Sequence, residues 1–139
     1  MGVHKVVPVI LRKRGESTEV LAFRHPLGGI QIIKGTVEAG EELQTAAVRE
    51  LAEESGISTL RSVAFKGTWN SGYKGQTWHF FLCEPEEELP DEWTFFTQDD
   101  GGLNFRFFWF DLSEEPDGEW DNIYANALDY IRVKLRAEV

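Results

Sequence analysis

Apolar and polar positions near the N-terminus alternate in a way that is typical of β-strands. Residues 3–11 are rich in Val and Ile, and residues 20–24 form a second apolar run. Gly15 lies between the two runs, where this residue type favours a turn. We therefore expect two strands that pair as a hairpin. The pattern breaks at residues 25–29 and resumes at residues 30–33, where we expect a third, short strand.

The middle of the chain changes to a helical period. Leu43, Ala47 and Leu51 are spaced four residues apart, and no proline interrupts them. Gly56 stands where a helix of this length would stop, because glycine readily adopts the left-handed conformation found after a last helical turn. The spacing predicts one helix that turns these three apolar side chains toward the core.

The second half of the chain repeats the succession of strands and helix. Residues 61–70 and 76–83 predict two strands around a turn at residues 71–75, and residues 105–111 predict a last strand. A C-terminal amphipathic helix is predicted by five residues at helical spacing: Trp120, Tyr124, Ala127, Ile131 and Leu135. The order of three strands, helix, three strands and helix predicts an α/β fold with a mixed sheet between helices.

Composition limits the class of protein. The 139 residues correspond to one domain by length, and 42% hydrophobic residues fit a globular chain. No apolar run approaches the roughly 20 residues of a membrane span. The basic cluster at the N-terminus follows the apolar run, opposite to the order in a signal peptide, so we expect a cytoplasmic protein without a membrane partner. Cys83 is the only cysteine, which excludes an intrachain disulfide, and its apolar neighbours predict burial.

Charge is distributed unevenly along the chain. The net charge of −10 disfavours nonspecific binding to nucleic acid or to an anionic membrane. All Lys and Arg residues before the central helix lie within residues 1–34, and among these Arg24 and Lys34 are candidates for contact with phosphate. His4 and His79 lie in predicted strands without a second metal-binding side chain at a suitable spacing, so we expect both to be structural.

Three carboxylates gather on the central helix. Spacings of three and four place Glu50, Glu53 and Glu54 on one helix face, where like charges repel. A hard divalent cation such as Mg²⁺ or Mn²⁺ would offset this repulsion, since such cations prefer oxygen ligands. The absence of His and Cys from the cluster argues against zinc. For the three glutamates alone, a solvated acidic helix face is the competing interpretation.

The wider segment carries a more specific pattern. Residues 35–57 follow the pattern G-x5-E-x7-R-E-U-x-E-E-x-G-U, where U is an aliphatic residue. This pattern resembles the signature of the Nudix hydrolases at every specified position. The resemblance implies an α/β/α sandwich and the metal-dependent hydrolysis of a nucleoside diphosphate linked to another group. Two or more metals among carboxylates could both neutralise the phosphates and activate a water.

The same resemblance implies roles for individual residues. Glu50, Glu53 and Glu54 would be metal ligands, together with the backbone carbonyl of Lys34. Arg49 and Glu41 would form a supporting ion pair that fixes the helix against its loop.

The chain departs from the family pattern at two places. Gln31 and Ile33 stand where the family commonly has an aromatic residue and a proline. Many members place a catalytic glutamate shortly before a tryptophan, whereas here Asp99 and Asp100 are the acids in the corresponding loop before Trp109. Glu53 is then our candidate for the general base.

The substrate is the least specified feature. Tyr73 lies sixteen residues after Ile57, where the resemblance places a tyrosine in dinucleoside polyphosphate hydrolases and a proline in ADP-ribose pyrophosphatases. Lys34–Gly35 also resembles the start of the signature in the former group, and Trp69 and Trp78 could stack on bases.

Several alternatives stay open beside a dinucleoside polyphosphate. A nucleoside triphosphate, a nucleotide sugar or an RNA 5′ end could be the substrate. A non-catalytic nucleotide-binding module and an isomerase acting on a prenyl diphosphate are alternatives of other classes. The sequence leaves the oligomeric state open.

Overall fold

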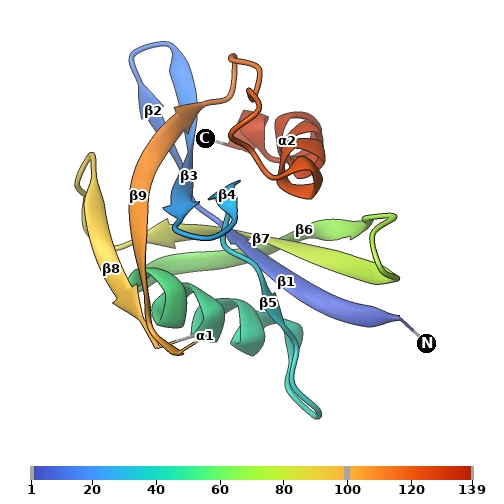
Figure 1. The fold of residues 1–139 in the computed structure, drawn as a ribbon. Helices are drawn as coiled ribbons and strands as arrows, with labels where there is room; N and C mark the ends of the chain where they lie inside the picture. Colours follow the sequence, from blue (N-terminus) through green and yellow to red (C-terminus); the bar gives the residue numbers. More distant parts are fainter. Residues whose placement is uncertain (1, 99–100, 139) are drawn as a thin grey trace.

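The computed structural model describes residues 2–98 and 101–138 (Figure 1). This part of the chain forms two α-helices, a short C-terminal 3₁₀ helix and nine strands. In chain order they are β1 (Val3–Val9), β2 (Leu11–Arg14), β3 (Ser17–His25), β4 (Gly29–Gln31), β5 (Gly35–Thr36), α1 (Leu43–Ser55), β6 (Leu60–Asn70), β7 (Gln76–Pro85), β8 (Trp93–Thr97), β9 (Leu103–Asp111), α2 (Asn122–Lys134) and η2 (Arg136–Glu138).

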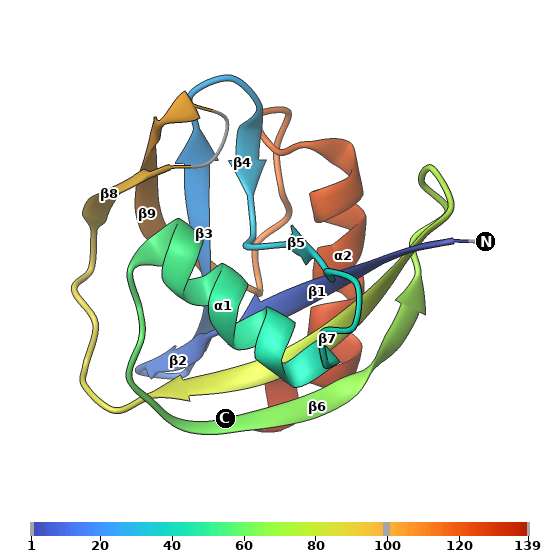
Figure 2. The same ribbon diagram turned by 90° about the horizontal axis from the view of Figure 1, so that it is seen from below.

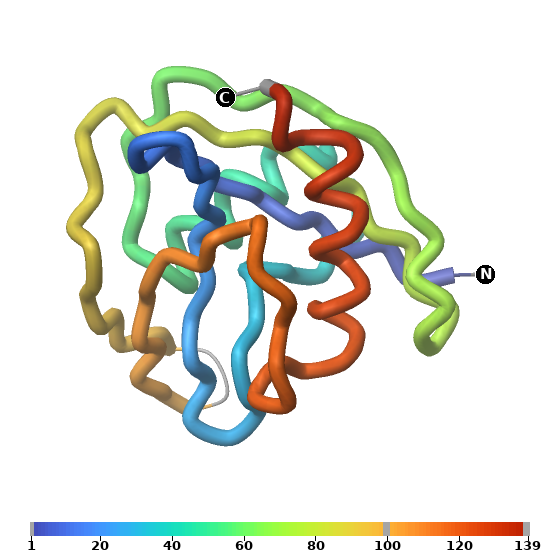
Figure 3. Tube along the Cα trace, turned by 90° about the horizontal axis from the view of Figure 1, so that it is seen from above, coloured from blue at the N-terminus to red at the C-terminus, as the bar shows by residue number. Residues whose placement is uncertain are grey.

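The strands form two curled sheets between the helices. One sheet has the order β5-β1-β7-β6, and the other has the order β2-β3-β9-β8 with β4 paired to β3. The first sheet is mixed because β1 runs parallel to β7, while its other pairs are antiparallel. The predicted α/β class is therefore confirmed, with the mixed β-structure divided into two sheets rather than one. In Figure 2 α1 lies in front of the strands, and in the opposite view of Figure 3 α2 lies in front.

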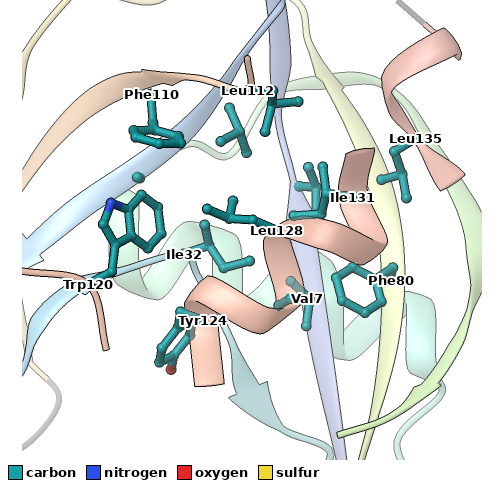
Figure 4. Close-up of a cluster of buried hydrophobic side chains, with 14 of the residues drawn as sticks. Val7, Ile32, Phe80, Phe110, Leu112, Trp120, Tyr124, Leu128, Ile131 and Leu135 are labelled. Atoms are coloured by element: carbon teal, nitrogen blue, oxygen red, sulfur yellow. The ribbon is translucent and has the colours of Figure 1, made fainter. Parts of the chain in front are cut away.

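Alternation along the strands produces a core on each side of the β-structure. Val6 packs in the cluster beside α1, whereas the next residue, Val7, packs in the cluster beside α2. Phe81 and Phe80 divide in the same way. Strands buried on both faces need apolar residues at successive positions, which explains the apolar run at the N-terminus. Figure 4 shows the cluster around Leu128 and Ile131 of α2.

Helix α1 matches the helix expected from the apolar spacing. Ala47 and Leu51 are fully buried, and Leu43 packs against the same cluster. Gly56 ends the helix with φ of 82° and donates its N–H to the carbonyl of Ala52. The left-handed conformation at this position explains the choice of glycine.

The expected pairing of the first two strands is wrong. The apolar run divides at Ile10 into β1 and β2, and only β2 forms the hairpin with β3. β1 instead joins the other sheet, between β5 and β7. The reason is the burial of β1 on both faces, which a two-stranded hairpin could not provide. Strand β8, which pairs with β9, was not predicted.

His4 and His79 contact each other, a pairing that their positions in the sequence did not predict. The parallel pairing of β1 and β7 brings His4 Nδ1 within 2.9 Å of His79 Nε2, although 75 residues separate them. The other ring nitrogen of His79 lies 3.0 Å from Thr68 Oγ1. A structural role for both rings agrees with this network.

This histidine pair predicts a loss of stability in mild acid. Burial, and secondarily the charge of His4, lower the pKa of His79 from its ordinary value. The folded state thus binds fewer protons than the unfolded chain, so stability is complete above the unfolded pKa of about 6.5 and falls as the pH drops below it. We expect the Tm to decrease between pH 7.5 and pH 5.5. Substitution His79→Gln should flatten this slope, and an equally steep slope in the variant would contradict the assignment to His79.

Candidate active site

A cavity of about 400 Å³ lies where α1 meets the strands that precede it. It is lined by residues from both sheets, α1 and the segment before β5: Lys5, His25, Gln31, Lys34, Gly35, Thr36, Glu50, Glu54 and Phe105. Figure 2 shows α1 beside β5 and β1, the elements that supply the cavity with its carboxylates and with Lys5. A buried acidic wall therefore faces a basic one.

Glu50 and Glu54 form the acidic wall. Each is only 7% exposed, although both are charged side chains. The backbone of Gly35 lies so close to Glu50 that an added Cβ would stand 1.8 Å from the Glu50 carboxyl carbon. A side chain at this position would displace Glu50, so the glycine at the start of the signature keeps space for a carboxylate. This close approach positions Glu50 at the cavity.

Arg49 offsets the repulsion among the helix carboxylates. Its guanidinium donates to both oxygens of Glu41, at 2.7 and 2.9 Å, and to the carbonyl of Thr36 at 3.0 Å. It also donates to Glu50 at 2.8 Å and to Glu53 at 3.2 Å. The expected ion pair with Glu41 is thus present, and the same side chain bridges two of the three helix glutamates.

The electrostatics of this network are strong. Hydrogen bonding from Arg49, and to a smaller extent from the backbone N–H of Glu38, lowers the pKa of Glu41 to about 2. The hydrogen bond with Glu41 in turn raises the pKa of Arg49 further above its already high value. Bidentate pairing of a guanidinium with a carboxylate also fixes geometry. The loop before α1 is therefore held against the helix by a permanent ion pair.

Lys34 and Lys5 form the basic wall. Burial, and then the charge of Lys5, lower the pKa of Lys34 to about 8. The Lys34 ammonium lies 4.8 Å from the ring centre of Trp78 and 5.1 Å from that of Tyr124, which is a cation–π arrangement. Lys5 Nζ donates to Thr36 Oγ1 at 2.6 Å. Two cations beside two buried carboxylates suit a ligand that carries phosphates and a metal.

The side chains of the cavity include suitable donors for a divalent metal. Within residues 2–98 and 101–138, no three His, Cys, Asp or Glu side chains already form a metal-binding group. Glu50 and Glu54 nevertheless supply two hard carboxylates to one cavity. Mg²⁺ commonly takes one or two carboxylates and completes its shell with waters and substrate phosphates. The cavity is therefore compatible with such a cation, which Glu50 and Glu54 would hold.

Other sequence-predicted residues lie outside the cavity. The Glu53 side chain is 46% exposed and contacts Arg49. Arg24 points to the opposite face of β3, where it pairs with Glu119 at 3.3 Å. Trp109 donates to the carbonyl of Pro90 and does not line the cavity. Asp99 and Asp100, the acids expected in the loop before it, lie outside the described residues.

The aromatic residues of the β6–β7 hairpin differ in exposure. Trp78 is completely buried, and Trp69 packs edge-on against it at 5.2 Å. Tyr73 is 39% exposed at the turn. Of the three aromatic candidates Tyr73 is thus the most exposed, with the Lys74 ammonium 5.2 Å from its ring centre, and it lies outside the lining of the cavity.

Sequence reasoning assigned no role to four lining residues outside the signature: Lys5, His25, Gln31 and Phe105. They come from four strands, and no fixed spacing links them to the signature. The only local signal was His25 in the break before the signature, a position where polar side chains often carry function.

The fold and the cavity together define an α/β protein with a carboxylate-bearing helix suited to metal-assisted phosphate chemistry. Comparison with known proteins gives the family: the model of the NUDIX domain matches residues 3–130. The chain belongs to the NUDIX domain family.

Individual relatives are distant. The chain is 29% identical over 118 residues to the ADP-ribose pyrophosphatase of Saccharomyces cerevisiae, a match that covers 81% of this chain and 51% of that protein. The chain thus spans about half the length of this curated relative.

Solved structures share the fold. One solved structure comes from a comparison of MutT from Aliivibrio salmonicida and Vibrio cholerae, and it superposes with a TM-score of 0.66 at 19% identity. The match covers 96% of this chain and 98% of that chain. The structure of the NUDIX domain of Shewanella oneidensis NrtR, complexed with ADP ribose, superposes with a TM-score of 0.66 at 13% identity. The match covers 96% of this chain and 88% of that chain. At these identities the likeness shows the fold alone.

No helix within residues 2–98 and 101–138 is long and apolar enough to cross a membrane.

Proposed function

We propose that this chain hydrolyses a pyrophosphate linkage in a nucleoside diphosphate derivative with the help of Mg²⁺ or Mn²⁺. One observation carries the proposal: two buried carboxylates of α1 and two lysines line the same cavity. Buried carboxylates repel each other and cost free energy unless a cation compensates them. Arg49 compensates Glu50 in part. A ligand consisting of metal and phosphates would add positive charge beside the carboxylates and negative charge beside the lysines.

The side chains of the cavity have different roles in this reaction. Lys34 and Lys5 bind phosphate oxygens and offset the charge that develops on the leaving group. Glu50 and Glu54 hold the metal, which when bound would make a water nucleophilic near neutral pH. Arg49, through Glu41 and Thr36, keeps α1 in register with the loop that carries Lys34 and Gly35.

The general base is assigned to Glu54 rather than to Glu53. Glu54 lines the cavity, whereas Glu53 lies outside it and contacts Arg49. A base must come within hydrogen-bond reach of the water it deprotonates. Glu53, the candidate from the sequence, remains the competing assignment.

ADP-ribose is the first substrate to test. The yeast relative is named an ADP-ribose pyrophosphatase, and the NUDIX domain of NrtR binds ADP ribose. With Trp78 buried, Tyr73 is the exposed aromatic at the turn of the hairpin, which is enough for one base. A dinucleoside polyphosphate, favoured by the Lys34–Gly35 and Tyr73 markers, is the second candidate. The net charge of −10 favours a small nucleotide over a long RNA, although an RNA 5′ end belongs in the same test.

A substrate panel tests the proposal. We expect ADP-ribose, a diadenosine polyphosphate, a nucleotide sugar, a nucleoside triphosphate or triphosphorylated RNA to be hydrolysed only when Mg²⁺ or Mn²⁺ is added. Comparison of kcat/KM ranks the substrates. Full activity in excess chelator would refute metal dependence. Tight nucleotide binding in calorimetry without turnover would favour a non-catalytic module instead.

Tyr73→Ala tests the stacking contact within that panel. Loss of one base contact is worth roughly 1 to 3 kcal/mol, so we expect kcat/KM for the best substrate to fall about 5- to 150-fold, mainly through KM. Neither Tyr73 nor Phe65 lines the cavity itself, so the expected contact is with a base that extends beyond it. Phe65→Ala is the matched control, because Phe65 is an exposed aromatic of the same hairpin that lies within β6 and not at the turn that carries Tyr73. Equal kcat/KM in the parent and in Tyr73→Ala would remove Tyr73 from the site.

A further inference from the structure

We propose that His25 is a substrate-binding residue whose Nε2–H donates a hydrogen bond to a phosphate oxygen in the cavity. The inference rests on the proposed function and adds a specific contact to it. His25 is the last residue of β3, and its ring is one of the groups that line the cavity with Glu50 and Glu54.

A backbone contact fixes the tautomer of His25. The N–H of Leu27 donates to His25 Nδ1 at 3.0 Å. A backbone amide can only donate, so Nδ1 must be the unprotonated ring nitrogen. The neutral ring therefore carries its proton on Nε2. Protonation of Nδ1 would place two hydrogens against each other and would break this turn.

Packing fixes the orientation of the same ring. The His25 ring lies 5.0 Å from the ring of Phe105, which also lines the cavity, and 6.4 Å from that of Phe23. No buried side-chain nitrogen or oxygen among the described residues lacks a hydrogen-bond partner. The half-buried ring lines the cavity and its Nδ1 is engaged by the turn, so Nε2 is the ring nitrogen left to contact a ligand there.

The fixed tautomer decides which chemistry His25 can perform. With Nδ1 occupied as an acceptor and Nε2 protonated, the neutral ring has no lone pair to take a proton from a water. His25 is thereby excluded as the general base, which agrees with the assignment of that role to Glu54. A fixed N–H beside two lysines instead suits the oxygens of a diphosphate.

Two substitutions separate the hydrogen bond to the ligand from the bond to the turn. Both remove the ring, so both lose the contact with Phe105. In His25→Asn the side-chain oxygen can still accept from Leu27 N–H, but the longer reach of Nε2 is lost. In His25→Gln the terminal amide reaches the position of Nε2 as a donor, while the acceptor for Leu27 is lost.

Binding and turnover are measured with both variants. The probes are the non-hydrolysable α,β-methylene analogue of ADP-ribose and inorganic pyrophosphate, each with Mg²⁺ in calorimetry, and the best substrate of the panel in kinetics. We expect His25→Asn to weaken binding and lower kcat/KM about tenfold at nearly parental Tm, as for loss of one hydrogen bond to a charged group. His25→Gln should recover most of the affinity and show the lower Tm.

The tautomer is tested without any ligand. Long-range ¹H–¹⁵N NMR of the histidine ring should show a protonated Nε2 and an unprotonated Nδ1 for His25. The opposite tautomer, equal affinity in the parent and His25→Asn, or a greater loss in His25→Gln would each overturn the proposal. A parent protein that binds the analogue but hydrolyses no nucleotide contradicts the proposed function alone, and the affinities of the two variants then still decide the role of His25. If the parent protein binds neither probe, both the proposed function and the proposed role of His25 are overturned.

Discussion

Substitution Glu54→Gln is expected to lower kcat by about 10²- to 10⁴-fold, the range for loss of a general base. The change keeps the shape of the side chain and removes one negative charge from a position that is only 7% exposed. Loss of a buried charge next to Glu50 also relieves repulsion, so the Tm should be equal to or higher than that of the parent. Steady-state kinetics and thermal unfolding of the same preparation measure the two effects.

The comparison with Glu53→Gln decides between the two candidate bases. Glu53 lies on the exposed side of α1 and contacts Arg49, so its amide variant should retain more kcat than Glu54→Gln. A greater loss in Glu53→Gln would restore the assignment made from sequence. Glu42→Gln is the matched control on the same helix, because Glu42 is exposed at the N-cap and its side chain makes no capping bond. It should leave kcat unchanged.

The parts of the fold that depend on local signals were predictable from sequence. The period of four from Leu43 to Leu51, and the stop at Gly56, depend on contacts within one helix, and the helix was predicted correctly. The β6–β7 hairpin was predicted because its turn joins neighbouring strands. The partner of β1 was not predictable, because its paired residues in β7 lie about half the chain away, as Val3 and Gln76 do, and only the packed structure brings them together.

In the candidate site, too, the residues of one continuous segment were predictable, and those brought in by tertiary packing were not. The carboxylates, Arg49 and Glu41 lie in one continuous segment, so spacing was sufficient to expect the ion pair. His25 and Lys5 reach the cavity from separate strands, and their position depends on how the two sheets are brought together. The tautomer of His25 depends on one backbone N–H of a turn, which no spacing rule could reveal.

Substitution Arg49→Met is expected to lower kcat/KM about 10- to 100-fold, as for residues that support metal ligands without touching the substrate. Methionine keeps most of the length of the side chain but loses every bond to Glu41, Thr36 and Glu50. Glu50 would then remain buried without its cation, so the Tm should fall as well. Assays well below the Tm separate misplacement from unfolding, and excess Mg²⁺ should restore part of the activity if the carboxylates have only lost their alignment.

Two further variants identify the physical cause of that loss. Arg49→Lys retains the charge, but an ammonium cannot reproduce the forked contact with Glu41, so an intermediate activity indicates that geometry matters as well as charge. Arg61→Met is the control, because Arg61 forms an exposed ion pair with Glu84 at 2.6 Å that does not reach the cavity. Surface pairs of this kind contribute little, so neither kcat/KM nor the Tm should change much. If Arg49→Met were as active as Arg61→Met, the carboxylates of α1 would be positioned by the helix alone, and the ion pair with Glu41 would serve only the stability of the loop.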